Sequence, residues 1–418
     1  MNKIKSAEII CVGTELLLGQ IVNTNAAFLA RELSLMGIYS YYQTVVGDNP
    51  ERLLAALKMA GSRSDLIVLT GGLGPTQDDL TMAVAAEFAG RKLVLHEPSL
   101  VSIKEYFQRL HRFEVTENNW KQAMMPVNSL VLPNNNGTAP GAIIEMDYAG
   151  QPLKIILLPG PPSEMQLMFQ ESVTPYLQQL TQTQLRHLFV RMIGIGESAA
   201  ETKMIDLINS QQNPTLAPYA MEGEVMFRIT QSFNNPDETD LTGPLLAEVR
   251  SRLGEFIYEV GPRTMPEVVK DLLLEQHKTI SFAESCTAGL VAAALTDYAG
   301  ASSVFRGGIV AYDNQVKEEL LHVPSHILLE HGAVSEACAS AMATGCRNVM
   351  KSDLAVAVTG IAGPSGGNDE KPVGLVWLAV AGPAGVQTRR LQLIGKRARI
   401  RKVAALNALD LARRYLLI

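Results

Sequence analysis

Residues 66–75, LIVLTGGLGP, join a short apolar run directly to a glycine-rich turn. Leu66 to Thr70 has the length and composition of a buried strand, and the glycines within residues 71–74 end it. Upstream, Ile9 to Val12 is a second apolar strand that stops at Gly13. Buried strands separated by amphipathic helices are typical of a parallel sheet covered on both faces. The sequence therefore predicts a three-layer α/β domain here.

The elements around this stretch set the size of the first domain. Apolar side chains recur at helical spacing from Asn25 to Met36, which predicts an amphipathic helix. Ile38 to Val46 is rich in strand-forming residues, and Ile155 to Leu158 is a later apolar strand. We therefore assign residues 1–180 to the first domain.

Two more domains are predicted downstream. Residues 181–262 indicate a small α+β connecting domain with a helix from Asp237 to Leu253, and without a catalytic motif we expect a spacer or dimerisation module. The prolines and the glycine of residues 261–266 mark its end. Residues 263–418 again alternate helices with apolar strands, at Ile280–Ala283, Gly308–Ala311, Leu354–Val358 and Leu375–Val380. The predicted fold class is α/β, with two three-layer α/β domains joined by a small α+β domain.

Composition excludes several classes of protein. The 418 residues carry 36 basic and 42 acidic side chains, so a net charge of −6 gives no long-range attraction for nucleic acid or anionic lipid. No apolar run approaches the roughly 18 residues that a membrane span needs. The four cysteines form no CxxC pair, which favours a reducing compartment. We expect a cytoplasmic protein that contacts neither membrane nor nucleic acid directly.

The strongest local signal is the run AESCTAG at residues 283–289. It follows a predicted strand and precedes a predicted helix at Leu290 to Thr296, so it lies at the edge of the sheet where α/β proteins bind ligands. Ser285 is a candidate nucleophile and Cys286 is its rival. Free N–H groups at the start of the helix would suit an anion or an oxyanion. In the alternative interpretation, Ser285 merely caps the helix.

A candidate base follows the next strand, where Tyr312 precedes Lys317 by five residues. A lysine in a dry pocket loses its proton more readily, because burial disfavours the charged form. The alternative is a surface lysine on a helix that runs to Leu321. The three nearby histidines are as readily solvated as catalytic, and they are His322, His326 and His331.

Two elements of the third domain suit phosphate. Residues 359–364, TGIAGP, follow a buried strand, and small residues let backbone N–H groups approach a ligand closely. Arg397 and Arg401 share one helix face, and paired arginines recognise phosphate well, whereas Arg399 points away. A connecting loop and a solvated basic face are the alternatives.

Several separated motifs resemble the CinA family of competence/damage-inducible proteins. In the third domain these motifs are residues 283–287, 308–317, 331–335, 360–367 and 371–374. In the first domain they are residues 13–15, 19–25, 71–79, 137–141 and 158–165. The former resemble the CinA C-terminal domain, whose characterised members are nicotinamide-mononucleotide amidohydrolases. The latter resemble the N-terminal domain, which implies a molybdopterin-binding-like fold.

The resemblance implies a Ser–Lys site without a cofactor in the third domain. Ser285 would attack the carboxamide, Lys317 would take its proton, and Tyr312 would relay a proton to the departing ammonia. Substrate would be positioned by Thr287, Thr359, Gly360 and Arg397. The chain departs from the family pattern twice, with Ala288 in place of the first glycine of Thr-Gly-Gly and Lys396 in place of an acid.

For the first domain the resemblance implies ADP-ribose pyrophosphatase activity with a divalent metal such as Mg²⁺. The phosphates would lie against Gly71, Gly72, Gly74 and Thr76, and the metal would bind Asp78 and Asp79. Paired aspartates also commonly cap a helix or supply charge to its first turn. A shared fold by itself does not imply a pterin ligand.

The leading hypothesis is therefore a bifunctional homodimeric enzyme of pyridine-nucleotide salvage, acting on nicotinamide mononucleotide and ADP-ribose. The alternative is a non-catalytic protein that binds a pterin or a competence-associated partner. A third possibility is an enzyme in which one of the two sites is inactive.

Overall fold

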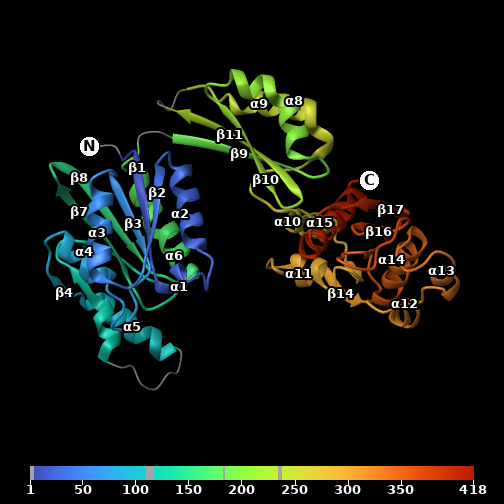
Figure 1. Cartoon of the computed structure of the whole chain (residues 1–418), viewed down its shortest axis with the longest axis horizontal. Coiled ribbons are helices and arrows are strands. Elements are labelled where there is room, and N and C mark those ends of the chain that lie inside the picture. The colour runs from blue at the N-terminus through green and yellow to red at the C-terminus, as the bar shows by residue number, and fades with distance from the viewer. Residues whose placement is uncertain (1–3, 110–116, 182–183, 234–237) are drawn as a thin grey trace. The chain divides into compact units, whose positions relative to one another are not determined.

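The computed structural model describes residues 4–109, 117–181, 184–233 and 238–418. The chain divides into two compact units, residues 1–186 with 232–239 and residues 187–231 with 240–418 (Figure 1). Among the described residues, no helix is both long and apolar enough to cross a membrane.

The first unit is built on a six-stranded sheet in the order β2-β1-β3-β8-β7-β6 (Figure 1). The strands are β1 (Ser6–Val12), β2 (Tyr39–Val46), β3 (Leu66–Thr70), β6 (Leu130–Leu132), β7 (Gly141–Tyr148) and β8 (Gln151–Leu158). The first four in the sheet order are parallel, as expected, but β7 is antiparallel to both β8 and β6, so β6 again runs in the direction of the first four. The sheet is therefore mixed. The reversal from β7 to β8 is a two-residue turn in which Ala149 and Gly150 both have positive φ.

Helices cover both faces of this sheet. Along β1, Ile9 and Cys11 pack with α2 and α6, whereas Ile10 and Val12 pack with α3 and α4. This alternation explains why the strand is apolar throughout. The helices are α1 (Thr14–Leu17), α2 (Thr24–Leu35), α3 (Pro50–Gly61), α4 (Thr81–Phe88), α6 (Pro162–Met168) and α7 (Thr174–Gln178). Beside them lie β4 (Leu93–Leu95), α5 (Glu97–Arg109) and β5 (Met124–Pro126).

A four-stranded sheet follows, in the order β10-β11-β9-β12. Its strands are β9 (Gln184–Met192), β10 (Thr215–Met221), β11 (Glu224–Phe233) and β12 (Ile257–Val260), with helices α8 (Glu197–Ser210) and α9 (Thr242–Leu253). The predicted helix from Asp237 was too long, because α9 begins at Thr242, where Asp240 accepts hydrogen bonds from the Thr242 N–H and hydroxyl. Asp237 itself lies outside the described residues.

The last part of the chain is a third sheet, in the order β14-β13-β15-β16-β17. Its strands are β13 (Ile280–Glu284), β14 (Phe305–Val310), β15 (Leu354–Gly360), β16 (Leu375–Gly382) and β17 (Gly385–Gln392). The first three in the sheet order are parallel, and β16 is antiparallel to both β15 and β17, so β17 again runs in the direction of the first three. One face packs against α10 (Met265–Glu275), α11 (Leu290–Thr296) and α15 (Arg397–Leu416), and the other against α12 (Asn314–Leu321), α13 (Ser325–Glu330) and α14 (Glu336–Met350).

The small four-stranded sheet packs against α15 of this last sheet. Ile193 and Tyr258 belong to the same buried cluster as the apolar face of α15. At the β10–β11 turn, a Cβ added to Gly223 would lie 3.1 Å from Val403, and Glu222 pairs with Lys402 at 3.3 Å. The four-stranded sheet has a core of its own and contacts the core beneath α15 through Ile193 and Tyr258.

Candidate active sites

Strand order brings the predicted residues of the third domain together. β13 lies between β14 and β15, so the residues that follow these three parallel strands meet at one edge. The Ser285 N–H donates to the Val358 carbonyl at 2.9 Å, and the Ala311 N–H donates to the Glu284 carbonyl at 2.8 Å. The chain leaves β13 toward β14 on one side and leaves β15 toward β16 on the other, and open α/β sheets bind ligands where connections diverge in this way.

Ser285 opens the turn of residues 285–288, which we call the nucleophile turn. Its side chain is 9% exposed, and its hydroxyl bonds to no other residue in the described part of the chain. The helix-cap interpretation of Ser285 is wrong, because Gly289 is the N-cap of α11. Ser285 is therefore left available for chemistry.

The carboxylate of Glu284 caps α11 instead. It accepts hydrogen bonds from the N–H groups of Gly289 at 2.8 Å, Val291 at 3.1 Å and Ala292 at 2.9 Å. The expectation of free N–H groups at the start of this helix is therefore wrong for these three groups. A buried side chain of the preceding strand already satisfies them.

Cys286 is a poor rival nucleophile. It is 5% exposed, and burial raises the pKa of its thiol to about 11. Because the thiolate is the reactive form, a thiol with this pKa is almost entirely protonated near neutral pH. The geometry favours Ser285.

Lys317 is buried, with 1% of its surface exposed, so the surface interpretation is wrong. Its Nζ donates to the carbonyls of Ala311 at 2.8 Å and Tyr312 at 3.2 Å, and lies 3.5 Å from that of Asp313. Burial lowers the pKa of this amine from its ordinary value. Within the described residues, no hydrogen bond joins Lys317 to Ser285.

Arg397 connects two of the other predicted residues. It donates to the Tyr312 hydroxyl at 2.9 Å and to the Gly363 carbonyl at 2.8 Å, so α15, the residue after β14 and the loop after β15 converge. Thr359 donates to the Ala333 carbonyl at 2.8 Å. A Cβ at Gly360 would lie 2.8 Å from a backbone oxygen, so only glycine fits there.

Two further residues refine the candidate site. The Thr287 hydroxyl is fully buried and, among the described residues, has no partner. Arg401, one turn after Arg397, donates to the carbonyls of Cys286 and Thr287 rather than presenting a free guanidinium. The spacing of Arg397 and Arg401 predicted that they share a helix face. It did not predict which groups the Arg401 guanidinium contacts. The three histidines of this region are exposed.

The two departures from the family pattern have local consequences. Ala288 has a φ of 50°, in the left-handed region that favours glycine. Lys396 is the N-cap of α15, and its side chain makes no capping bond, whereas an acidic side chain there would.

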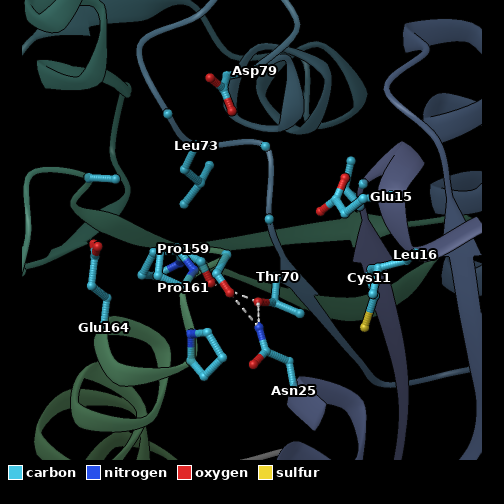
Figure 2. Close-up of a pocket in the computed structure, with 18 of the residues that line it drawn as sticks. Cys11, Glu15, Leu16, Asn25, Thr70, Leu73, Asp79, Pro159, Pro161 and Glu164 are labelled. Carbon is cyan, nitrogen blue, oxygen red and sulfur yellow. Dashed lines mark hydrogen bonds between the residues drawn. The ribbon is translucent and has the colours of Figure 1, made fainter. Parts of the chain in front are cut away.

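The first unit contains a cavity of about 810 Å³ at the carboxyl ends of β1, β3 and β8 (Figure 2). The predicted phosphate and metal residues all line it, and they are Gly71, Gly72, Gly74, Thr76, Asp78 and Asp79. β2 and β3 flank β1, so the cavity again lies where the strand connections diverge.

Glycine is required along this wall of the cavity. Gly71 has a φ of 100°, and a Cβ there would lie 2.2 Å from the Val12 carbonyl oxygen. Gly72 has a φ of 67°, and its Cβ would lie 2.2 Å from the Thr81 hydroxyl. Glycine therefore lets the turn pack closely against β1 and α4 in the wall of the cavity.

Asp79 holds the loop rather than capping α4. Its Oδ2 accepts from the Thr76 N–H at 2.8 Å and from the Thr76 hydroxyl at 2.6 Å, and Lys121 donates to the Thr76 and Asp79 carbonyls. The helix-cap and first-turn interpretation is wrong, because α4 begins at Thr81 with Leu80 as N-cap. This leaves Asp78 and one oxygen of Asp79 for a cation.

The donor set suits a cation that arrives with phosphate. Among the described residues, no group of three or more His, Cys, Asp or Glu side chains could hold a metal. Two carboxylates do fit Mg²⁺, which commonly keeps several waters and binds through one or two carboxylates and the phosphates of its substrate.

Sequence reasoning missed two residues of this cavity. The Asn25 side-chain amide donates to the Thr70 hydroxyl at 3.0 Å and to the Gly160 carbonyl at 2.8 Å, which ties α2 to the ends of β3 and β8 (Figure 2). Glu164 lies on a different side of the cavity from Asp79 (Figure 2). Burial raises the pKa of Glu164, and Asn134 donates to it at 2.6 Å. Both residues stand in the family-like motifs, but spacing alone assigned them no chemistry.

Comparisons with known proteins cover nearly all of the chain. Residues 8–179 match the family described as "Probable molybdopterin binding domain", residues 188–258 the damage-inducible protein CinA KH domain, and residues 262–416 the CinA C-terminal domain. A CinA-like protein of Dictyoglomus turgidum is 51% identical over 411 residues, covering 98% of this chain and 99% of that protein. A CinA-like protein of Kosmotoga olearia is 49% identical over 412 residues, covering 98% and 99%.

Among solved structures, the competence/damage inducible protein CihA of Agrobacterium tumefaciens is 38% identical. The match covers 38% of this chain and all of that chain, with a TM-score of 0.36.

Proposed function

The chain belongs to the CinA family, and from this premise we propose that its C-terminal domain hydrolyses the carboxamide of nicotinamide mononucleotide to nicotinate mononucleotide and ammonia. The observation that carries the proposal is the order of three adjacent parallel strands: Ser285 directly follows β13, Lys317 lies on the helix after β14, and Thr359 lies near the end of β15. A buried amine, an unbonded hydroxyl and an arginine at one sheet edge suit acyl transfer from a phosphate-bearing amide substrate to a serine.

In this proposal Ser285 is the nucleophile and Lys317 the base. Neutral Lys317 has two N–H bonds and one lone pair. The two N–H bonds suffice for the carbonyls at 2.8 and 3.2 Å, because the third carbonyl at 3.5 Å is at the limit of hydrogen bonding. The lone pair can then take the Ser285 proton once substrate brings the two groups together.

The reaction proceeds in two balanced steps. Ser285 Oγ forms a bond to the carboxamide carbon, the C–N bond breaks, and the proton held by Lys317 leaves with ammonia. Tyr312 is exposed and its hydroxyl accepts from Arg397, and in this proposal that hydroxyl relays the proton. Water then hydrolyses the ester and restores Ser285. Thr287, Thr359, Gly360 and Arg397 would position the nucleotide.

Ammonia release from nicotinamide mononucleotide tests this function. Ser285→Ala and Lys317→Ala should each lose activity by at least about 1,000-fold, as expected when a nucleophile or its base is removed. Asn314→Ala, an exposed neighbour of the site, serves as the control. Undiminished release by either of the first two variants would exclude the mechanism.

A second activity is supported by the cavity of the first domain. We propose that it hydrolyses the pyrophosphate of ADP-ribose to AMP and ribose 5-phosphate. The turn at Gly71 and Gly72 would bind phosphate, while Asp78 and Asp79 would hold a divalent cation, which would neutralise charge on the pyrophosphate. Glu164, whose pKa is raised by burial, can hold a proton on another side of the cavity.

AMP formation from ADP-ribose, with Mg²⁺ and with a chelator, tests the second activity. Asp78→Asn should reduce AMP formation, whereas Ser285→Ala should leave it unchanged, because that residue belongs to the other domain. A pterin that co-purifies with the protein, together with no AMP formation, would favour the binding-protein alternative for this domain.

A further inference from the structure

A second arginine of helix α15, Arg401, contacts the nucleophile turn. The Arg401 guanidinium donates from Nε to the Cys286 carbonyl at 3.0 Å and from Nη2 to the Thr287 carbonyl at 2.8 Å. Both bonds go to backbone oxygens of the turn. Arg401 is thus engaged differently from Arg397, which contacts a phenol hydroxyl and a loop carbonyl.

We propose that Arg401 is a positioning residue that fixes the nucleophile turn so that the N–H of Thr287 stabilises the oxyanion formed when Ser285 attacks. This inference rests on the proposed amidohydrolase function and concerns the same site. Arg397 and Arg401 share one face of α15, but in this proposal only Arg397 contacts the substrate.

Peptide geometry links the Arg401 bonds to the N–H of Thr287. In a planar trans peptide the carbonyl and the N–H of the next residue point in opposite directions. When Arg401 holds the Cys286 carbonyl, the Thr287 N–H is therefore directed away from Arg401. Likewise, the Ala288 N–H, opposite the Thr287 carbonyl, donates back to Ser285 at 3.1 Å. Two successive peptide planes are set by one guanidinium.

The Thr287 N–H is buried. Within the described residues, neither it nor the Cys286 N–H donates to an oxygen. Burial raises the pKa of the Cys286 thiol, and these two N–H groups act in the opposite direction. A thiol is a weak acceptor, so an oxyanion would be the better partner.

The turn is held from two sides. Glu284 binds the N–H groups after the turn, and Arg401 binds the carbonyls within it. The helix that carries Arg401 is held in place, because Ile400 and Ala404 on the same helix are buried in the core beneath α15. Preorganised donors of this kind stabilise a transition state without reorganising during the reaction.

The test compares three arginines of α15. Arg401→Met should lower kcat for ammonia release by about 100-fold, the effect expected for one lost oxyanion donor, while KM changes less than about threefold. Arg401→Lys, with a single ammonium, should recover part of kcat. Arg397→Met should instead raise KM. Arg399 lies two residues before Arg401 and its side chain is exposed. Arg399→Met removes the same charge and should change neither kcat nor KM.

A second measurement does not depend on the natural substrate. The rate at which a fluorophosphonate labels Ser285 should fall at least about tenfold in Arg401→Met and stay unchanged in Arg399→Met, because the attack places charge on a phosphoryl oxygen. A higher KM with unchanged kcat in Arg401→Met, or equal labelling rates, would overturn the inference. If the wild type released no ammonia but was labelled normally, and labelling still depended on Arg401, the proposed substrate would be refuted. The inference about Arg401 would then stand.

Discussion

Replacing Glu284 with glutamine should destabilise the C-terminal domain by about 3 kcal/mol, because this buried carboxylate alone serves three N–H groups. The amide oxygen of glutamine can replace the oxygen that binds Gly289 and Val291. The amide NH₂ must then face the Ala292 N–H, which leaves a buried donor unsatisfied at a cost of about 1–3 kcal/mol. Loss of the negative charge at the start of α11 costs roughly a further 0.3–1 kcal/mol.

The assay is urea unfolding followed by the fluorescence of Trp377, together with hydrogen exchange of the peptide that contains α11. Glu267→Gln is the matched control, because Glu267 accepts from the Thr264 N–H and hydroxyl in a more exposed cap. It should cost only about 1 kcal/mol. If Glu284→Gln lost no more stability than Glu267→Gln, or if α11 exchanged as slowly as in the wild type, the capping argument would be refuted.

Four further predictions concern single residues of the C-terminal domain. Ala288→Gly should raise its free energy of unfolding by about 0.5–1 kcal/mol, since relief of a left-handed alanine exceeds the entropy cost of glycine; reduced stability in thermal unfolding would contradict this. Lys396→Asp should add about 1 kcal/mol by capping α15, and Lys396→Ala should not. Burial opposes ionisation of Asp410, yet neighbouring arginines lower its pKa. Its contribution is therefore complete above the unfolded-state pKa of about 3.9 and lost as pH falls through the folded-state value, so Asp410→Asn should flatten the acid loss of stability in urea titrations. Finally, kcat/KM for ammonia release should rise with pH as Lys317 loses its proton and level off below 10.5, the ordinary pKa of lysine. If the same rise with pH persisted in Lys317→Arg, it would belong to the titration of another group.

The central strands were predictable because a strand that is buried on both faces is apolar along its whole length. Leu66 to Thr70 was predicted with its observed bounds, and the apolar cores of β13 and β15 were found within one or two residues. The core of β16 was predicted at Leu375–Val380, but its antiparallel direction was not, and neither β7 nor β17 was predicted. The turn at Ala149 and Gly150 lacks the Asn-Gly or Asp-Gly signature of a tight hairpin, and a strand's direction depends on such turns.

The candidate sites were predictable where residues follow strands, because parallel strands end at one edge. Ser285 and the turn at Gly71 are of this kind. The burial of Lys317 was not predictable, because its helix has the pattern of a half-exposed one and the carbonyls that surround its amine belong to backbone. The roles of Glu284 and Arg401 depend on a turn and on a helix more than 100 residues later, which no local pattern encodes.

The most direct test of the Ser285 amidohydrolase is ammonia release from nicotinamide mononucleotide by Ser285→Ala and Cys286→Ala, measured beside the wild type. The two residues are adjacent, but one hydroxyl is free and the neighbouring thiol has a pKa of about 11. We predict that the wild type releases ammonia, that Ser285→Ala loses at least about 1,000-fold in kcat, and that Cys286→Ala stays within about threefold. Loss of activity in Cys286→Ala with retention in Ser285→Ala, or no release by the wild type, would contradict the assignment.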